Sequence, residues 1–204
     1  MIEVNAEDQY AVVSGEVTLE TVLDALPTGL RYRAPRLALT LEDWLLSGGV
    51  GVLNAPPLRA DVLGLTYRGA HGMVAVGGIV VKNVSGYDLR LVIGSDPALE
   101  RQLQIERAVL RLRPGNKLEA RAQRVSEAEL ELTFAALRDL GALYAYAARA
   151  DDVWLLRAEF EPGQATWGES ASDVFPRATR DALGAFPRPA PQRSSLENAL
   201  LAAL

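Results

Sequence analysis

Apolar residues recur along the first half of the chain with two different spacings. Between residues 19 and 26 they follow the i, i+3, i+4, i+7 spacing of a helix with one buried face, and Thr18 precedes them in the position of an N-cap. Four short apolar runs are typical of strands instead, at residues 10–13, 62–67, 73–76 and 79–81. Gly77-Gly78 separates the last two runs and favours a hairpin there, because primed turns need positive φ angles.

The character of the sequence changes near Pro114, where we place the boundary between two domains. Residues 105–113 before it alternate between apolar and polar and predict a strand with one buried face. After it, a helix begins with capping-box spacing at Ser126 and Glu129 and ends at Gly141. Strands are predicted around this helix to give a β-α-β unit, at residues 118–124, 143–147 and 153–160. Two further helices are predicted, at residues 172–183 and, after a proline-rich connector, 196–204.

This order of elements predicts an α+β fold. The first domain spans residues 1–114, and the second, with an antiparallel sheet and helices, spans residues 115–190. Residues 191–204 are expected to form a C-terminal helix that returns to the first domain.

Composition and charge exclude several classes of function and cofactor. The 204 residues are 49% hydrophobic and 23% charged, and no run of about 18 apolar residues is present to cross a bilayer. The net charge is -5 with no basic cluster, which argues against a nucleic-acid partner. The acidic N-terminal residues lack the pattern of a secretory signal, so we expect a cytoplasmic location. With no Cys and a single His71, Cys-ligated zinc, iron–sulfur clusters and Cys nucleophiles are excluded, and redox chemistry would need a cofactor.

A glycine cluster is the first candidate site. Gly48, Gly49 and Gly51 expose bare backbone N–H groups that can approach a phosphate or a flat ring closely. The alternative interpretation is a helix over residues 41–47 that Gly48 ends.

A second candidate site follows the predicted strand at residues 79–81. Asn83, Gly86, Tyr87 and Asp88 place hydrogen-bond donors and acceptors around a glycine, as at a strand end that positions a polar ligand. The alternative is a turn with an Asx-type hydrogen bond followed by a helix.

No catalytic residue is assigned. The chain shows neither a P-loop nor a Ser/His/Asp order that would support nucleophilic catalysis, and metal ligands are not predicted. Glu159 and Glu161 fall on one face of a predicted strand, which gives glycosidase-type acid/base chemistry no particular support.

Residues 77–89, followed by Ile93-Gly94-Ser95 and the strand at residues 109–114, resemble the FAD-binding domain of the vanillyl-alcohol oxidase (PCMH) type. The resemblance is strongest to the E subunit of bacterial glycolate oxidase. That family carries a lysine-asparagine-x-threonine-glycine-tyrosine-aspartate-leucine signature, which occurs here with Ser85 in place of threonine. Thr40-Leu41 and the glycine cluster match the family's flavin-contacting segment in position, and residues 117–185 resemble its smaller cap domain.

The resemblance implies a flavoprotein oxidoreductase, the FAD-binding subunit of a flavin-dependent 2-hydroxy-acid oxidase complex. Its implied partners are a larger flavin-bearing D-type subunit and an iron–sulfur subunit. The cofactor FAD would contact the residues of both candidate sites and, by family position, the backbone of Ile105: Gly48, Gly49, Gly51, Asn83, Gly86, Tyr87, Asp88 and Ile105.

Several departures from the family pattern favour another role. The family's glycine-rich phosphate loop would precede Met1, so the flavin domain is expected to be N-terminally shortened. Glu42 and Asp43 stand where the family has two glycines, and their carboxylates would repel a diphosphate. The alternative function is therefore a non-catalytic interaction subunit that has lost flavin binding. Self-association into a homo-oligomer is a further alternative for the face that the missing part would cover.

Overall fold

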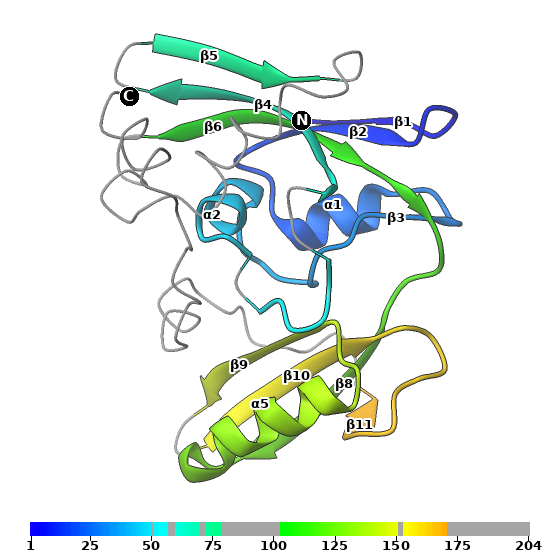
Figure 1. The fold of residues 1–204 in the computed structure, drawn as a ribbon, viewed down its shortest axis with the longest axis vertical. Coiled ribbons are helices and arrows are strands. Elements are labelled where there is room, and N and C mark those ends of the chain that lie inside the picture. Colours follow the sequence, from blue (N-terminus) through cyan, green and yellow to red (C-terminus); the bar gives the residue numbers. More distant parts are fainter. Residues whose placement is uncertain (50, 57–59, 70–71, 79–102, 151–152, 171–204) are drawn as a thin grey trace.

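Antiparallel strands and a few short helices make up the α+β fold seen in Figure 1, as the sequence predicts. The structure is a computed structural model and describes residues 1–49, 51–56, 60–69, 72–78, 103–150 and 153–170. The predicted strand at residues 79–81, the second arm of the Gly77-Gly78 hairpin and the predicted helices at residues 172–183 and 191–204 lie outside the described residues.

A five-stranded antiparallel sheet forms the first half of the molecule (Figure 1). Its strands, in spatial order, are β1 (Ile2–Asn5), β2 (Tyr10–Ser14), β6 (Gln104–Arg111), β4 (Val62–Gly69) and β5 (Gly72–Gly77). Helices α1 (Leu19–Ala25) and α2 (Leu41–Leu46) lie on one face of this sheet. Strand alternation turns Ala11, Val13 and Leu110 toward these helices, where they are fully buried.

The helix predicted at residues 19–26 is confirmed as α1, and Thr18 accepts a hydrogen bond from the Thr21 N–H as its N-cap. The predicted strand at residues 105–113 is only partly correct, because the ladder of β6 stops at Arg111. Buried Leu112 separates it from β7 (Arg113–Pro114), which turns away to pair with β3 (Leu30–Arg31). The chain thus leaves the five-stranded sheet after Arg111 and enters a two-stranded sheet at Arg113.

A four-stranded antiparallel sheet forms the second half of the molecule. Its strands, in spatial order, are β11 (Glu169–Ser170), β8 (Glu119–Val125), β10 (Val153–Phe160) and β9 (Tyr144–Ala150). The short helix η2 (Glu127–Glu129) leads into α5 (Leu130–Asp139), which covers one face (Figure 1). The predicted capping box at Ser126 is present. The predicted β-α-β unit is split, since β10 lies between β8 and β9 and pairs with both.

Strand β9 faces two hydrophobic cores at once. Tyr144 and Tyr146 pack into the core of the five-stranded sheet and its helices, whereas Ala145 and Ala147 pack into the core beneath α5. The two sheets are therefore in contact through side chains of β9. The separation into domains 1–114 and 115–190 stays a prediction.

In the described ranges, no helix combines the length and the apolar character needed to cross a membrane.

Candidate cofactor site and the contact between the two sheets

Helix α2 carries two carboxylates in its first turn, Glu42 and Asp43. Its N-cap residue, Thr40, accepts a hydrogen bond from the Asp43 N–H at 3.1 Å and donates its hydroxyl to Asp43 Oδ2 at 2.9 Å. This reciprocal pair satisfies a backbone donor that the first turn of a helix leaves unpaired, and it puts negative charge at the positive end of the helix dipole. Asp43 therefore has a structural role in the start of α2.

The glycines that follow α2 end the helix. The Gly49 N–H donates to Trp44 O and the Gly48 N–H donates to Leu45 O, both at 3.0 Å. These two bonds form a Schellman motif, with Gly48 left-handed at φ 75°. The alternative interpretation of this segment, a helix ended by Gly48, is confirmed. The N–H groups of both glycines are thus already bonded within the chain.

Gly51 connects this turn to the second sheet. Its carbonyl oxygen accepts from the Ala145 N–H of β9 at 2.8 Å, and Val52 forms an isolated antiparallel bridge with Tyr144. The Leu53 N–H donates to Leu143 O, just before β9, at 2.9 Å. A Cβ atom at Gly51 would lie 3.2 Å from Ala145 O, and its φ of 86° is in the left-handed region. Glycine is needed here for a close approach to β9.

Ile105 faces the opposite end of α2. Its N–H donates to the Glu42 Oε1 atom at 2.8 Å, so the side chain of Glu42 binds the first helix turn to β6. Gly15 makes this approach sterically feasible, because a Cβ atom there would lie 1.9 Å from the Ile105 carbonyl oxygen. The Gly15 carbonyl in turn accepts from the Glu42 N–H at 2.9 Å.

Helix α2 therefore separates the predicted flavin contacts that the structure describes. Ile105 lies at its first turn and the glycine cluster follows its last, about 9 Å further along the axis at 1.5 Å per residue. Asn83, Gly86, Tyr87 and Asp88 lie outside the described residues.

Three of the predicted flavin contacts, Gly48, Gly49 and Ile105, do not fit a cradle for the FAD diphosphate. Such a cradle needs backbone N–H groups that point to the ligand. The N–H groups of Gly48, Gly49 and Ile105 donate to acceptors of the chain itself, and the acceptor at Ile105 is a carboxylate.

An ionic cluster at the first sheet has no signal in the sequence pattern. Asp61, only 4% exposed, accepts from the Arg33 Nε atom and from Arg113, whose Nη2 atom lies 2.8 Å from Asp61 Oδ1. Two guanidinium groups thus neutralise one buried carboxylate, as burial of a charge requires. Nearby, the hydroxyl group of Tyr32 is buried without a hydrogen-bond partner, and burial raises the pKa of this phenol well above its ordinary value.

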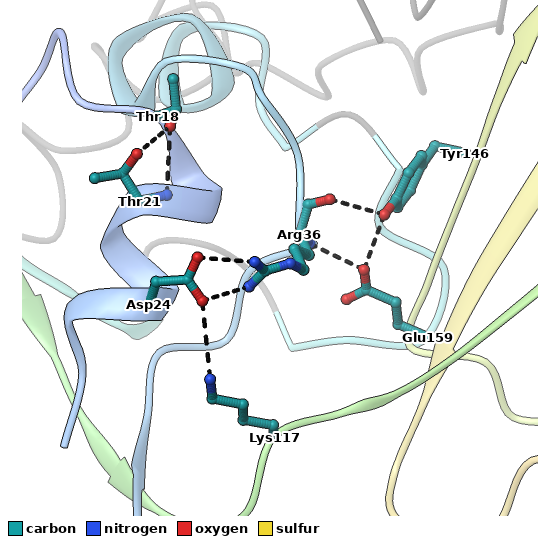
Figure 2. A network of polar contacts seen from close by, with 7 residues as sticks. All are labelled: Thr18, Thr21, Asp24, Arg36, Lys117, Tyr146 and Glu159. Atoms are coloured by element: carbon teal, nitrogen blue, oxygen red, sulfur yellow. Dashed lines mark hydrogen bonds and ion pairs between the residues drawn. The ribbon is translucent and has the colours of Figure 1, made fainter. Parts of the chain in front are cut away.

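A polar network joins the two sheets in Figure 2, with Arg36 at its centre. The Arg36 guanidinium donates to both carboxylate oxygens of Asp24 on α1, each at 2.8 Å, and lowers the pKa of that carboxyl group. The Arg36 backbone N–H donates to Glu159 Oε1 at 2.9 Å. The Tyr146 hydroxyl lies 2.9 Å from both Arg36 O and Glu159 Oε1.

Glu159 in β10 and Glu161, which follows the end of that strand at Phe160, have different surroundings. Glu159 is 2% exposed, and burial raises the pKa of its carboxyl group even though Arg157 Nε lies 3.5 Å away and acts to lower it. Glu161 accepts two 2.7 Å hydrogen bonds from Arg31, which lowers the pKa of its carboxyl group. The prediction that both side chains share one strand face is only partly correct, because β10 ends at Phe160; both carboxyl groups nevertheless contact residues of the first half of the chain, Arg36 and Arg31.

No model of a known protein family matches the chain, and no curated protein matches it. Among the described residues, no group of His, Asp and Glu side chains is arranged to hold a metal ion.

Proposed function

We propose that the chain is a subunit of a flavin-dependent 2-hydroxy-acid oxidase complex, similar to the E subunit of glycolate oxidase, and that it serves there as a non-catalytic interaction subunit. The signature at residues 82–89 and the PCMH-type pattern around it support the assignment to this type of complex. An α+β fold with a five-stranded sheet and a smaller sheet beneath a helix is compatible with a shortened flavin domain and its cap.

The observation that carries the non-catalytic role is the occupation of backbone donors around α2. Gly48, Gly49 and Ile105 are expected flavin contacts by position in the family, yet each N–H donates to an acceptor of this chain. If these N–H groups bound FAD instead, the hydrogen bonds that end α2 and the hydrogen bond from β6 to Glu42 would be lost. Each such bond contributes about 1 kcal/mol, and about 1.5–3 kcal/mol where the acceptor is charged.

The Glu42 carboxylate adds an electrostatic cost to FAD binding near Ile105. A diphosphate that approached the Ile105 N–H would meet a negative charge 2.8 Å from that nitrogen. At short range and low effective dielectric, like charges repel by several kcal/mol.

The resemblance names the partners for this role, a larger flavin-bearing D-type subunit and an iron–sulfur subunit. In this arrangement the D-type subunit carries the flavin, and the present chain holds the complex together. Self-association of this chain is the alternative, and the molecular mass of the assembly distinguishes it from a complex with the D-type subunit.

The second candidate function is FAD binding by this chain itself. The signature residues Asn83, Gly86, Tyr87 and Asp88 favour it, since they retain the family pattern apart from the neighbouring Ser85. Bound FAD supplies the chemistry of hydride removal from the hydroxyl-bearing carbon, whereas the protein supplies orientation.

Reconstitution of the complex tests the proposal. The chain is co-expressed with the D-type and iron–sulfur subunits, and size-exclusion chromatography and flavin content are measured with and without it. We expect co-elution with the D-type subunit and the same flavin content per D-type subunit in both preparations. Separate elution would overturn the interaction role, and one additional FAD for each copy of this chain would establish the second candidate.

A further inference from the structure

Three arginines converge where β3 pairs with β7. Arg31 of β3 and Arg113 of β7 are directly opposite each other in the two-stranded sheet, and Arg33 follows two residues after Arg31. Like charges opposite each other on neighbouring strands repel, so this arrangement needs anions. Asp61 and Glu161 supply them, and we call these five residues the arginine cluster.

The two carboxylates of the arginine cluster do not use all of its donors. Glu161 accepts both of its 2.7 Å hydrogen bonds from Arg31. Asp61 Oδ1 accepts from Nε and Nη2 of Arg113 at 2.9 and 2.8 Å, and Asp61 Oδ2 accepts from Arg33 Nε. Among the residues that the structure describes, neither Nη group of Arg33 has an acceptor. Three cations thus face two anions, which leaves one positive charge in excess and one guanidinium edge free.

A neutral donor without a partner lies beside this edge. The Tyr32 hydroxyl is buried and makes no hydrogen bond. Its pKa is raised first by burial, and the charges of Asp61 and Arg33 also act on it in opposite directions, which places the hydroxyl near both groups. A buried donor is costly unless an acceptor reaches it. The side chain of Arg113 is 38% exposed, so the arginine cluster is accessible from solvent on that side.

A carboxylate is the ligand that matches these donors. Its two oxygens fit the two parallel N–H groups that a guanidinium edge presents. Its single negative charge also balances the excess charge of the arginine cluster, whereas a dianion such as sulfate would exceed it.

We propose that the arginine cluster binds a small carboxylate through the free Nη groups of Arg33, with the Tyr32 hydroxyl as a further donor. The site binds its ligand and carries out no chemistry on it. It is independent of the proposed function, because it needs neither flavin nor another subunit.

An acetate titration of the full chain tests the site. Sodium acetate replaces sodium chloride at constant sodium concentration and pH 7, and NMR follows the guanidinium Nε–Hε resonances of Arg33 and Arg113. We expect saturable shifts of both resonances and weaker binding of sulfate in the same experiment. Shifts that do not saturate, or sulfate that binds as tightly as acetate, would overturn the proposal.

Arg33→Lys removes the guanidinium edge and keeps the charge. We expect it to weaken acetate binding by about tenfold or more, followed at the Arg113 resonance, because an ammonium group cannot bind a carboxylate through two parallel N–H groups. Arg124→Lys is the matched control at an exposed arginine of β8, and it should bind acetate like the parent. Unchanged affinity in Arg33→Lys would contradict the site.

Tyr32→Phe leaves every hydrogen bond of the arginine cluster in place, so it keeps the test decisive even where Arg33→Lys fails to fold. Without acetate we expect this variant to be at least as stable as the parent, since the hydroxyl it removes has no partner. Its affinity for acetate should fall several-fold, and acetate should raise its Tm less than that of the parent. Tyr10→Phe on β2 is the control. Parent-like affinity in Tyr32→Phe would show that the assignment of its hydroxyl to this site is wrong.

Discussion

Replacement of Glu42 tests its contact with the Ile105 N–H, which in the proposed function hinders a flavin diphosphate. In Glu42→Ala the Ile105 N–H loses its acceptor at 2.8 Å, and Ile105 is only 2% exposed, so water does not easily replace the bond. A hydrogen bond to a charged acceptor contributes about 1.5–3 kcal/mol, and a buried donor left unpaired costs a similar amount. We therefore expect a loss of about 2 kcal/mol in the free energy of unfolding.

Glu42→Gln is the matched control because its amide oxygen can still accept from Ile105. We expect it to lose less than about 1 kcal/mol. Urea denaturation followed by tryptophan fluorescence measures the free energy of unfolding of both variants. In thermal unfolding, the Tm of a chain of this size shifts by about 2–4 °C for each kcal/mol. Hydrogen exchange at the Ile105 amide reports on the bond itself. If Glu42→Ala proves no less stable than Glu42→Gln and leaves this amide protected, the assigned role of Glu42 is wrong.

Three further substitutions test other contacts. Gly15→Ala should lower the free energy of unfolding by about 3 kcal/mol or more, because its Cβ would lie 1.9 Å from a backbone oxygen. Gly69→Ala is the control: its Cβ would have 3.7 Å of clearance, and the free energy of unfolding should change by under about 1 kcal/mol. Asp61→Asn should cost about 2–4 kcal/mol in thermal or urea unfolding, since it leaves two guanidinium groups without their carboxylate; a neutral result would contradict the cluster. Because Arg31 lowers the pKa of Glu161 in the folded chain, the ionised carboxylate stabilises the fold at pH values above the pKa of the unfolded chain. This stabilisation is lost as the pH falls through the lower pKa of the folded chain. Glu161→Gln should thus be less stable than the parent at pH 7, by under about 1 kcal/mol given its partial exposure, and equal to it in acid; a difference that grows toward acid would refute this sign.

Local patterns predict local elements well in this chain. The spacing between residues 19 and 26 and the cap at Thr18 give α1, and the apolar run at residues 153–160 gives β10 with the same bounds. In each case the deciding information lies within one element, because period and cap chemistry depend only on neighbouring residues. The end of α2 at Gly48 follows from the same logic.

The contacts that define the candidate site are not local. Arg36 meets Glu159 across 123 positions, and Glu42 meets Ile105 across 63. Nothing in the spacing of either pair signals the contact, since each side chain taken alone is typical of a solvated residue. The pairing of β6 between β2 and β4 brings Glu42 and Ile105 together, and that strand order is a property of the whole fold.

FAD binding by the isolated chain is the most direct test of the central claim that the backbone donors around α2 are used within the chain. The purified chain is incubated with excess FAD, passed through gel filtration and measured by visible absorption, with the amide resonances of Gly48, Gly49 and Ile105 followed by NMR. We predict a protein fraction without flavin absorption and unchanged amide resonances. Flavin bands that elute with the chain, together with shifts of these three amides, would contradict the account.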